Sequence, residues 1–141
     1  SEQQTKVIKE AAQLHDVGKI GISDEILKKP DFLNDFERDI MNQHPLIGEG
    51  IIIPLHGMAH LRDPIRHHHE WGNGDGYPDH LKSDKISLEA KILTVADSFD
   101  AMTTDRPYRK KMDFSLAKEE LLKYKDIRYD GKVVDAFISC L

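Results

Sequence analysis

Residues 87–105, SLEAKILTVADSFDAMTTD, carry the strongest helical pattern in the chain. Apolar side chains recur there at helical spacing, at Leu88, Ile92, Val95, Phe99 and Met102. This spacing predicts an amphipathic helix with one face in a core. Asp97 interrupts the apolar face, and a buried carboxylate without a partner is costly. We therefore expect a metal ion or a hydrogen bond from a neighbouring helix at Asp97, with Asp100 as its support.

The segments on either side of this helix also have helical periodicity. The expected helices cover residues 4–17, a short turn capped by Ser23 or Asp24, residues 32–53 with Asn34 or Asp35 as cap and an interruption at Pro45, and residues 59–70, 113–125 and 131–141. Residues 71–87 contain three glycines and one proline, which predicts a loop. Because no segment alternates apolar and polar residues as a strand does, the expected fold class is all-α.

The composition fits one globular domain over residues 1–141, with 39% hydrophobic and 32% charged residues. The net charge of −5 argues against a DNA-binding surface. Cys140 is the single cysteine, and no apolar run approaches the ~20 residues of a membrane span. We therefore expect a reducing, cytoplasmic location. The chain begins without Met in helix-like sequence, so we expect it to be a piece of a longer protein, which could itself be membrane-tethered.

The stretch HHHEWGNGDGYP, residues 67–78, is the most informative candidate for a functional site. Neutral imidazoles are the commonest transition-metal ligands, and His68 and His69 stand side by side before a carboxylate. The glycines that follow allow the backbone to approach a ligand closely. A solvated histidine run before a turn is the alternative, but it would not require the sequence Gly-Tyr-Pro behind it. The stretch therefore predicts a metal site next to a loop.

A second cluster combines His15, Asp16 and Lys19 at the end of the first expected helix. Neighbouring helical residues point about 100° apart, so His15 and Asp16 suit two adjacent metal ions better than one. A surface hydrogen bond between the two side chains is the alternative. His44 precedes Pro45, which is expected to break the helix and expose the imidazole. A lone histidine in such a place is more often a surface or capping residue than a metal ligand.

Arg106 and Arg109 follow the strongest helix in the sequence DRPYR. Two guanidinium groups on one proline-fixed turn suit phosphate recognition, whereas pairing with Asp105 and Asp113 is the alternative. Trp71 could stack on a base, but packing is the stronger interpretation. The remaining histidines are expected at the surface: His56, His60, His67 and His80.

Taken in order, these motifs resemble the HD-GYP family of bacterial cyclic dinucleotide phosphodiesterases. The matching stretches are LHDVGKIGISDEILKKP, QHPLIGEGI, RHHHEWGNGDGYPDHLKSDKI and AKILTVADSFDAMTTDRPYRKKM, which extend over about residues 11–112 and leave residues 113–141 as C-terminal helices. The resemblance implies an HD-domain helical bundle with a long GYP loop around two or three divalent metal ions, iron or manganese. The activity that it implies is hydrolysis of cyclic di-GMP to pGpG or GMP.

The resemblance also assigns roles to residues. It implies the metal ligands His15, Asp16, His44, His68, His69 and Asp97. Asp16 would bridge two ions, His15 and Asp97 would hold one of them, and the other histidines would hold the second. The substrate contacts that it implies are Lys19, Tyr77, Arg106 and Arg109. Lys19 and Asp16 would be the catalytic residues, with Lys19 contacting the scissile phosphate and protonating the leaving oxygen.

The chain departs from the family pattern in its first segment. The family takes one more histidine from a helix upstream of the His-Asp pair, whereas the fourteen residues before His15 contain none, with Glu2 and Glu10 as carboxylates. We therefore expect an N-terminally truncated HD-GYP domain, or one completed by a homodimer. Ser23 stands where the family often has proline.

The parent protein would carry an upstream sensory or receiver domain. Two alternatives remain: a non-catalytic module that binds cyclic dinucleotide or a signalling protein through the GYP loop, and a general HD-type nucleotide phosphohydrolase. The sequence GDGYP argues against the phosphohydrolase.

Overall fold

The computed structural model describes residues 1–106 and 109–141, and these residues form an all-helical bundle. The elements are α1 (Glu2–Leu14), η1 (Val17–Gly21), α2 (Asp24–Leu27), α3 (Asp35–Met41), α4 (His44–Ile52), η2 (Ala59–Leu61), α5 (Arg62–His67), η3 (Ser83–Lys85), α6 (Leu88–Thr103), α7 (Phe114–Lys123) and α8 (Gly131–Ser139), where η marks a 3₁₀-helix. Within the described ranges, β-type pairing is confined to isolated bridges. The expected all-α class is confirmed.

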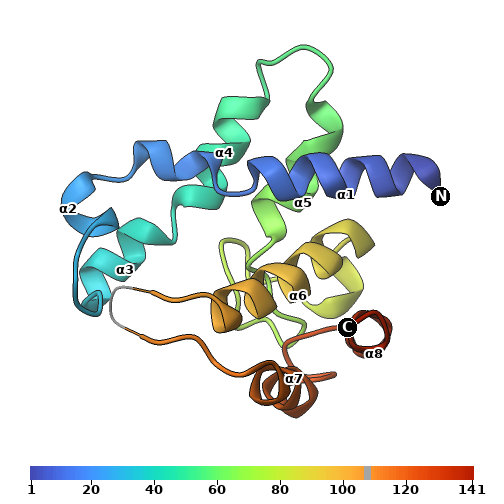
Figure 1. Ribbon diagram of the computed structural model, residues 1–141. Helices are drawn as coiled ribbons and strands as arrows, with labels where there is room; N and C mark the ends of the chain where they lie inside the picture. The colour runs from blue at the N-terminus through green and yellow to red at the C-terminus, as the bar shows by residue number, and fades with distance from the viewer. Residues whose placement is uncertain (107–108) are drawn as a thin grey trace.

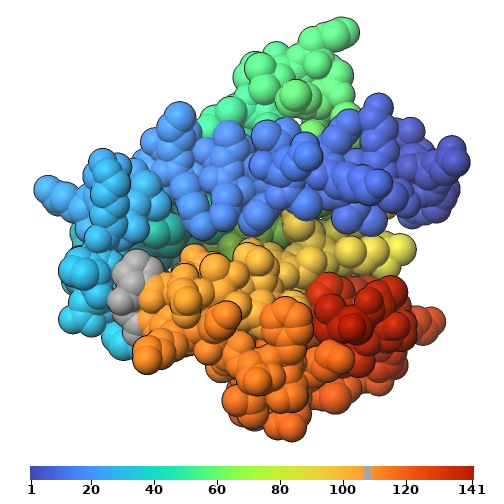
Figure 2. All heavy atoms as spheres, viewed as in Figure 1, coloured from blue at the N-terminus to red at the C-terminus, as the bar shows by residue number. Residues whose placement is uncertain are grey.

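Helix α6 is the central element of the bundle. In Figure 1, α1 crosses above it together with α4 and α5, and α7 and α8 lie below it. Figure 2 shows the N-terminal segment as a continuous band over α6, with the C-terminal helices on the opposite side. The helix contributes Leu93 to one core cluster, shared with α1 and α5. It contributes Val95, Phe99 and Met102 to a second cluster, shared with α7 and α8.

Most of the expected apolar face of α6 is buried, but its first member is not. Val95 is fully buried, and Phe99 and Met102 are 7% and 8% exposed, whereas Leu88 is 49% exposed. Leu88 lies in the first turn, immediately after the cap Ser87, whose hydroxyl accepts the backbone N–H of Ala90 at 3.2 Å. The cap fixes where the helix begins, and within that first turn Ala90 is fully buried whereas Leu88 stays half exposed.

The expected long helix over residues 32–53 is two helices. Asn34, not Asp35, is the cap of α3: its side chain accepts the N–H of Glu37 at 2.9 Å, and Glu37 accepts the N–H of Asn34 at 2.9 Å. Helix α3 ends at Met41, and α4 begins at His44 with Pro45 in its first turn. Proline suits that position because the N–H that it lacks would have no helical partner there. The expected break therefore comes before the proline.

The expected helix over residues 59–70 is also shorter and divided. It consists of η2 followed by α5, which ends at His67, with Pro64 in its first turns. Helix α2 has Ser23 at its N-cap position, although the Ser23 side chain makes no capping hydrogen bond.

Gly18 allows η1 to lie directly against α4. A Cβ atom at this position would be 1.8 Å from the backbone oxygen of His44 and 2.5 Å from the backbone nitrogen of Gly48. Such distances are far inside van der Waals contact, so only glycine permits this approach. The contact fixes the segment that carries Asp16 and Lys19 beside the start of α4.

We expect Gly18→Ala to lower the free energy of unfolding by about 3 kcal/mol, because the added methyl group must separate η1 from α4. Gly50→Ala is the matched control: Gly50 lies in α4, and a Cβ atom added there would have no neighbouring atom within 4 Å, so alanine should be neutral or stabilising. Urea denaturation of both variants measures the difference. Equal stability of the two would contradict the packing argument.

Candidate metal centre

Three histidines from different elements are oriented in the same way. His15 follows α1, His44 begins α4, and His68 follows α5. In each ring Nδ1 lies 2.7–2.8 Å from the backbone carbonyl three residues earlier. A carbonyl oxygen only accepts, so each Nδ1 carries the proton of that hydrogen bond. For a neutral ring this leaves the lone pair on Nε2, which is how proteins commonly fix a metal-binding imidazole.

The first group of candidate ligands is formed by His44, His68 and His69, whose ligand atoms all lie within 4.8 Å of one another. His44 and His68 are buried, at 2% and 0% exposure, and their Nε2 atoms are 3.3 Å apart. Two lone pairs at this distance repel each other unless a cation lies between them. This donor set therefore fits a divalent metal ion. The expectation that Pro45 would expose the His44 imidazole is wrong, because α4 packs this first turn into the interior.

The second group is formed by His15, Asp16 and His68, again within 4.8 Å. The two oxygens of Asp16 face different histidines: Oδ1 lies 3.4 Å from Nε2 of His44, and Oδ2 lies 3.5 Å from Nε2 of His15. A carboxylate in this position can hold two ions at once. Lys19 donates a hydrogen bond to Oδ2 at 2.7 Å. Burial opposes ionisation of Asp16, but the Lys19 hydrogen bond and the nearby charges of His15, Lys19 and His44 together outweigh it and lower the pKa of the carboxyl.

Asp97 extends from α6 toward the same centre. Its Oδ1 lies 3.5 Å from Nε2 of His15. Burial opposes ionisation, but the His15 hydrogen bond and the neighbouring imidazoles lower the pKa of Asp97 to about 2. The polar interruption in the apolar face of α6 is thus explained by the histidines opposite it. Asp100, expected as support for Asp97, is exposed and accepts a hydrogen bond from the Thr104 hydroxyl at 3.4 Å instead.

The imidazoles of the first group are held neutral. Burial lowers the pKa of His68 to about 4, lowers that of His44, and lowers that of His69 well below its ordinary range. His15 differs: burial opposes its protonation, but the hydrogen bonds to Asp97 and to the Ala12 carbonyl, together with the negative charges of Asp16 and Asp97, raise its pKa overall. At neutral pH three rings therefore present lone pairs, as metal binding requires.

In the metal-free chain, the free energy of unfolding should fall as the pH is lowered from about 6.5 to about 4. The unfolded chain protonates His68 below its ordinary pKa of 6.5, whereas the folded chain keeps it neutral down to about 4. The unfolded state then binds more protons, which costs up to about 1.4 kcal/mol per pH unit. Urea unfolding after chelation at several pH values measures this slope. His68→Asn should flatten it, and an unchanged slope would contradict the assignment.

A cleft of about 400 Å³ opens beside the histidines. Its lining residues are Lys19, Ile26, Leu27, Lys29, Asp31, Leu33, Met41, His44, His69, Tyr77 and Arg106. The cationic side chains and the candidate metal ligands His44 and His69 thus share the cleft with apolar side chains from α2, α3 and the segment between them. Sequence reasoning missed this apolar wall because short apolar segments carry no signal that separates a cleft wall from a core.

The expected substrate contacts are divided between the cleft and its surroundings. The Tyr77 ring stacks on the His69 ring, with centroids 4.9 Å apart and planes at 24°. Arg106 lines the cleft, but Nη2 of Arg109 donates to the backbone oxygen of Ala101 at 2.7 Å. Pro107, on which the expected rigid turn depends, lies with Tyr108 outside the described residues.

The two carboxylates considered as alternative partners of Arg106 and Arg109 bind other groups. Asp105 accepts the N–H of Lys111 at 2.9 Å, and Asp113 caps α7 through the N–H of Ser115 at 3.1 Å. These carboxylates therefore have other partners.

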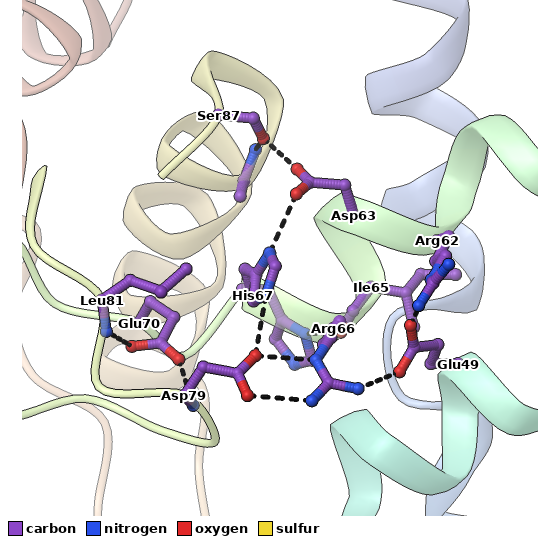
Figure 3. A network of polar contacts seen from close by, with 12 residues as sticks. Glu49, Arg62, Asp63, Ile65, Arg66, His67, Glu70, Asp79, Leu81 and Ser87 are labelled. Carbon is purple, nitrogen blue, oxygen red and sulfur yellow. Dashed lines mark hydrogen bonds and ion pairs between the residues drawn. The ribbon is translucent and has the colours of Figure 1, made fainter. Parts of the chain in front are cut away.

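Four histidines are expected at the surface, and the expectation is wrong for His67. Its side chain is 15% exposed and lies between two carboxylates, with Nδ1 2.9 Å from Asp63 and Nε2 2.9 Å from Asp79 (Figure 3). The three others are exposed, and His60 pairs there with Glu10, one of the upstream carboxylates, at 2.7 Å. Trp71 packs under the Arg128 guanidinium, 4.1 Å from the ring centroid, so its expected packing role is confirmed.

Known proteins are similar to this chain in sequence and in fold. Residues 1–133 match the family described as HD domain. The chain is 38% identical over 145 residues to the cyclic di-GMP phosphodiesterase response regulator RpfG of Xanthomonas campestris pv. campestris, a match that covers 98% of this chain and 37% of the relative. It is 41% identical over 133 residues to the cyclic di-GMP phosphodiesterase of Thermotoga maritima, covering 92% of this chain and 36% of the relative. The solved structure of Bd1817, an HDG"Y"P protein from Bdellovibrio bacteriovorus, aligns with a TM-score of 0.74 and 18% identity over 94% of this chain and 42% of that chain.

A helical bundle with clustered histidines and aspartates, next to a cleft, defines the class of protein. The chain belongs to the HD domain family, and the resemblance to HD-GYP proteins that the motifs indicate is confirmed. It spans about a third of the length of the curated relatives described above. Within the described ranges, none of the helices combines the length and apolar character that crossing a membrane requires.

Proposed function

We propose that this chain is a metal-dependent phosphodiesterase domain that hydrolyses cyclic di-GMP to pGpG or GMP in bacterial second-messenger signalling. The observation that carries the proposal is the position of Asp16, whose two oxygens each face a different histidine, His15 and His44. The cleft beside it contains Lys19 and Arg106, two cations suited to a phosphodiester. The names of two relatives, both cyclic di-GMP phosphodiesterases, support the choice of substrate.

The donor set favours two divalent ions, and iron or manganese is the proposed identity. His15 and Asp97 would hold one ion, and the ligands of the other would be His44, His68 and His69, with Asp16 shared between them. When bound, a pair of divalent ions supplies Lewis-acid stabilisation of phosphoryl oxygens and lowers the pKa of the attacking water. A third ion would need ligands beyond these six residues.

The remaining side chains of the cleft bind and orient the substrate. Lys19 and Arg106 would balance the negative charge that develops on the phosphoryl oxygens, and such fixed charges act most strongly where water is excluded. The Nζ atom of Lys19 also carries the proton that the leaving oxygen needs. Tyr77, stacked on His69, would form the wall against which the substrate lies. Arg109 is the weakest of the proposed substrate contacts, because its guanidinium already binds the Ala101 carbonyl.

The proposed setting is a cytoplasmic signalling protein in which an upstream sensory or receiver domain controls this one. A homodimer and a signalling partner bound at the GYP loop remain part of the proposal.

The test is a metal count joined to a turnover assay. The chain is purified without oxygen under reducing conditions with iron and manganese supplied, and its metal content is measured by elemental analysis. We expect about two ions per chain and hydrolysis of cyclic di-GMP but not of GMP. Bound cyclic di-GMP without metal or turnover would instead indicate a non-catalytic binding module. Preferred hydrolysis of the mononucleotide would indicate a general nucleotide phosphohydrolase.

A further inference from the structure

Glu70 follows the metal-binding histidines in the sequence, but its carboxylate serves the loop that comes after them. The residue is 1% exposed. Its Oε1 accepts the N–H of Asp79 at 2.6 Å, and its Oε2 accepts the N–H of Leu81 at 2.9 Å (Figure 3). A buried carboxylate is costly unless its oxygens are hydrogen-bonded, and here both are used by backbone groups. Among the described residues, Glu70 belongs to neither cluster of candidate ligands.

The same loop is held a second time through the side chain of Asp79. Arg66 donates to both of its oxygens, from Nε at 2.7 Å and from Nη2 at 2.8 Å. His67 adds a contact from Nε2 at 2.9 Å. The other side of Arg66 pairs with Glu49, a buried residue of α4. One guanidinium therefore joins the loop to α4, which begins at His44, and to α5, which His68 follows.

The part of the loop just before these anchored residues packs directly against the backbone of the histidine segment. The N–H of Tyr77 donates to the carbonyl of His69 at 3.1 Å. Gly76 lies so close that a Cβ atom there would be 2.3 Å from the nitrogen of Trp71 and 2.5 Å from the oxygen of His69. This approach brings the Tyr77 ring onto the His69 ring, at the wall of the cleft.

On the basis of the proposed function, we propose that Glu70 and the Arg66–Asp79 pair form a loop clamp that positions Tyr77 in the substrate cleft. The clamp consists of the two backbone bonds to Glu70 and the two-point ion pair of Asp79. Its members are positioning residues: they hold the loop at Asp79 and Leu81, the residues that follow Tyr77. Loss of the clamp should weaken substrate binding, which Tyr77 serves, and leave the metal ligands in place.

Glu70→Gln is the direct test, because glutamine keeps the shape but offers one accepting oxygen to two donors. The amides of Asp79 and Leu81 should then exchange hydrogen about tenfold faster, the factor expected for one lost charge-assisted hydrogen bond. The metal content should be unchanged, KM should rise about tenfold, and kcat should change less than about threefold. Asp79→Asn, which weakens the second anchor from the solvent side, should act in the same direction if Glu70→Gln does not fold.

The matched control is Asp130→Asn. Asp130 is a partly buried carboxylate that, like Glu70, accepts backbone N–H groups: it pairs with Lys91 at 3.1 Å, caps α8 and does not line the cleft. The Asp130→Asn substitution should lower thermal stability without changing KM or the hydrogen exchange of the Asp79 and Leu81 amides. Loss of metal from Glu70→Gln would overturn the proposal, because it would make Glu70 a support of the metal ligands.

A double-mutant cycle with Tyr77→Ala tests whether the clamp acts through Tyr77. In that background Glu70→Gln should add less than about threefold to KM, since the ring that it positions is gone. Full additivity would overturn the proposal. Amide exchange and metal content are measured without substrate, so they test the clamp even if the chain does not hydrolyse cyclic di-GMP. Unchanged exchange in a chain that does turn over would contradict the clamp and not the proposed function.

Discussion

Asp16→Ala is expected to lower turnover of cyclic di-GMP by about a thousandfold and to remove both metal ions. Asp16 lies between His15 and His44, within 3.5 Å of an Nε2 atom on each side. Without the carboxylate, each group of histidines loses the negative charge that favours a cation. The effect on the rate follows, because removal of one main electrostatic contribution to a transition state costs about 10²–10³, and here the loss of metal adds to it.

Elemental analysis and a single-turnover assay with the purified variant measure both effects. Asp24→Ala is the matched control: Asp24 binds Lys28 at 2.6 Å much as Asp16 binds Lys19 at 2.7 Å, but the Asp24 side chain is 74% exposed. This control should keep its metals and its activity. Near-normal turnover of Asp16→Ala would refute the assignment of the centre, whatever its metal content.

The helices could be predicted from the sequence because their patterns are local. The buried face of α6 follows from apolar spacing, and the capping box at Asn34 follows from one side chain three residues before a glutamate. The break near His44 is harder to place, since proline both ends helices and favours their first turn. The packing of η1 on α4, which Gly18 allows, decides between a proline that ends one helix and a proline in the first turn of the next.

The grouping of ligands could be predicted in part. Residue types and the resemblance bring together the histidines and aspartates, and the structure places them around one centre. The direction of each side chain could not be predicted. His67 and His68 are neighbours of the same type, yet one turns to Asp63 and Asp79 and the other to His44. A rotation of about 100° per helical residue separates His67, which anchors the loop, from His68, which is a candidate ligand. The packing of the helix decides which of the two faces the metal centre.

The two arginines after α6, Arg106 and Arg109, also differ in the direction of their side chains. Their backbones pair with each other, with the Arg106 N–H donor nitrogen 2.8 Å from the oxygen of Arg109. Their side chains nevertheless differ, since Arg106 lines the cleft and Arg109 binds Ala101. Spacing in the sequence predicts proximity of the backbone, whereas the partner of a long flexible side chain depends on acceptors that come from elsewhere in the fold.

Lys19→Ala is expected to lower kcat by about a hundredfold while the metal content stays near that of the unmodified chain. The Lys19 ammonium lies 2.7 Å from Asp16 and lines the cleft, so it can reach a phosphoryl or leaving oxygen there. Loss of one preorganised cation of this kind costs about 10²-fold or more in rate. KM should change little, because the charge acts most strongly on the transition state.

The contrast between Lys19 and Asp16 separates catalysis from metal binding. Lys28→Ala is the control, since Lys28 makes an equivalent pair with Asp24 on the exposed side of α2 and should leave kcat unchanged. If Lys19→Ala loses its metals as Asp16→Ala does, then the cation supports the centre by holding Asp16 in place, and its proposed contact with the substrate is refuted. If the metals stay and kcat falls, Lys19 acts on the phosphate itself, because its hydrogen bond to Asp16 is then not required to build the centre.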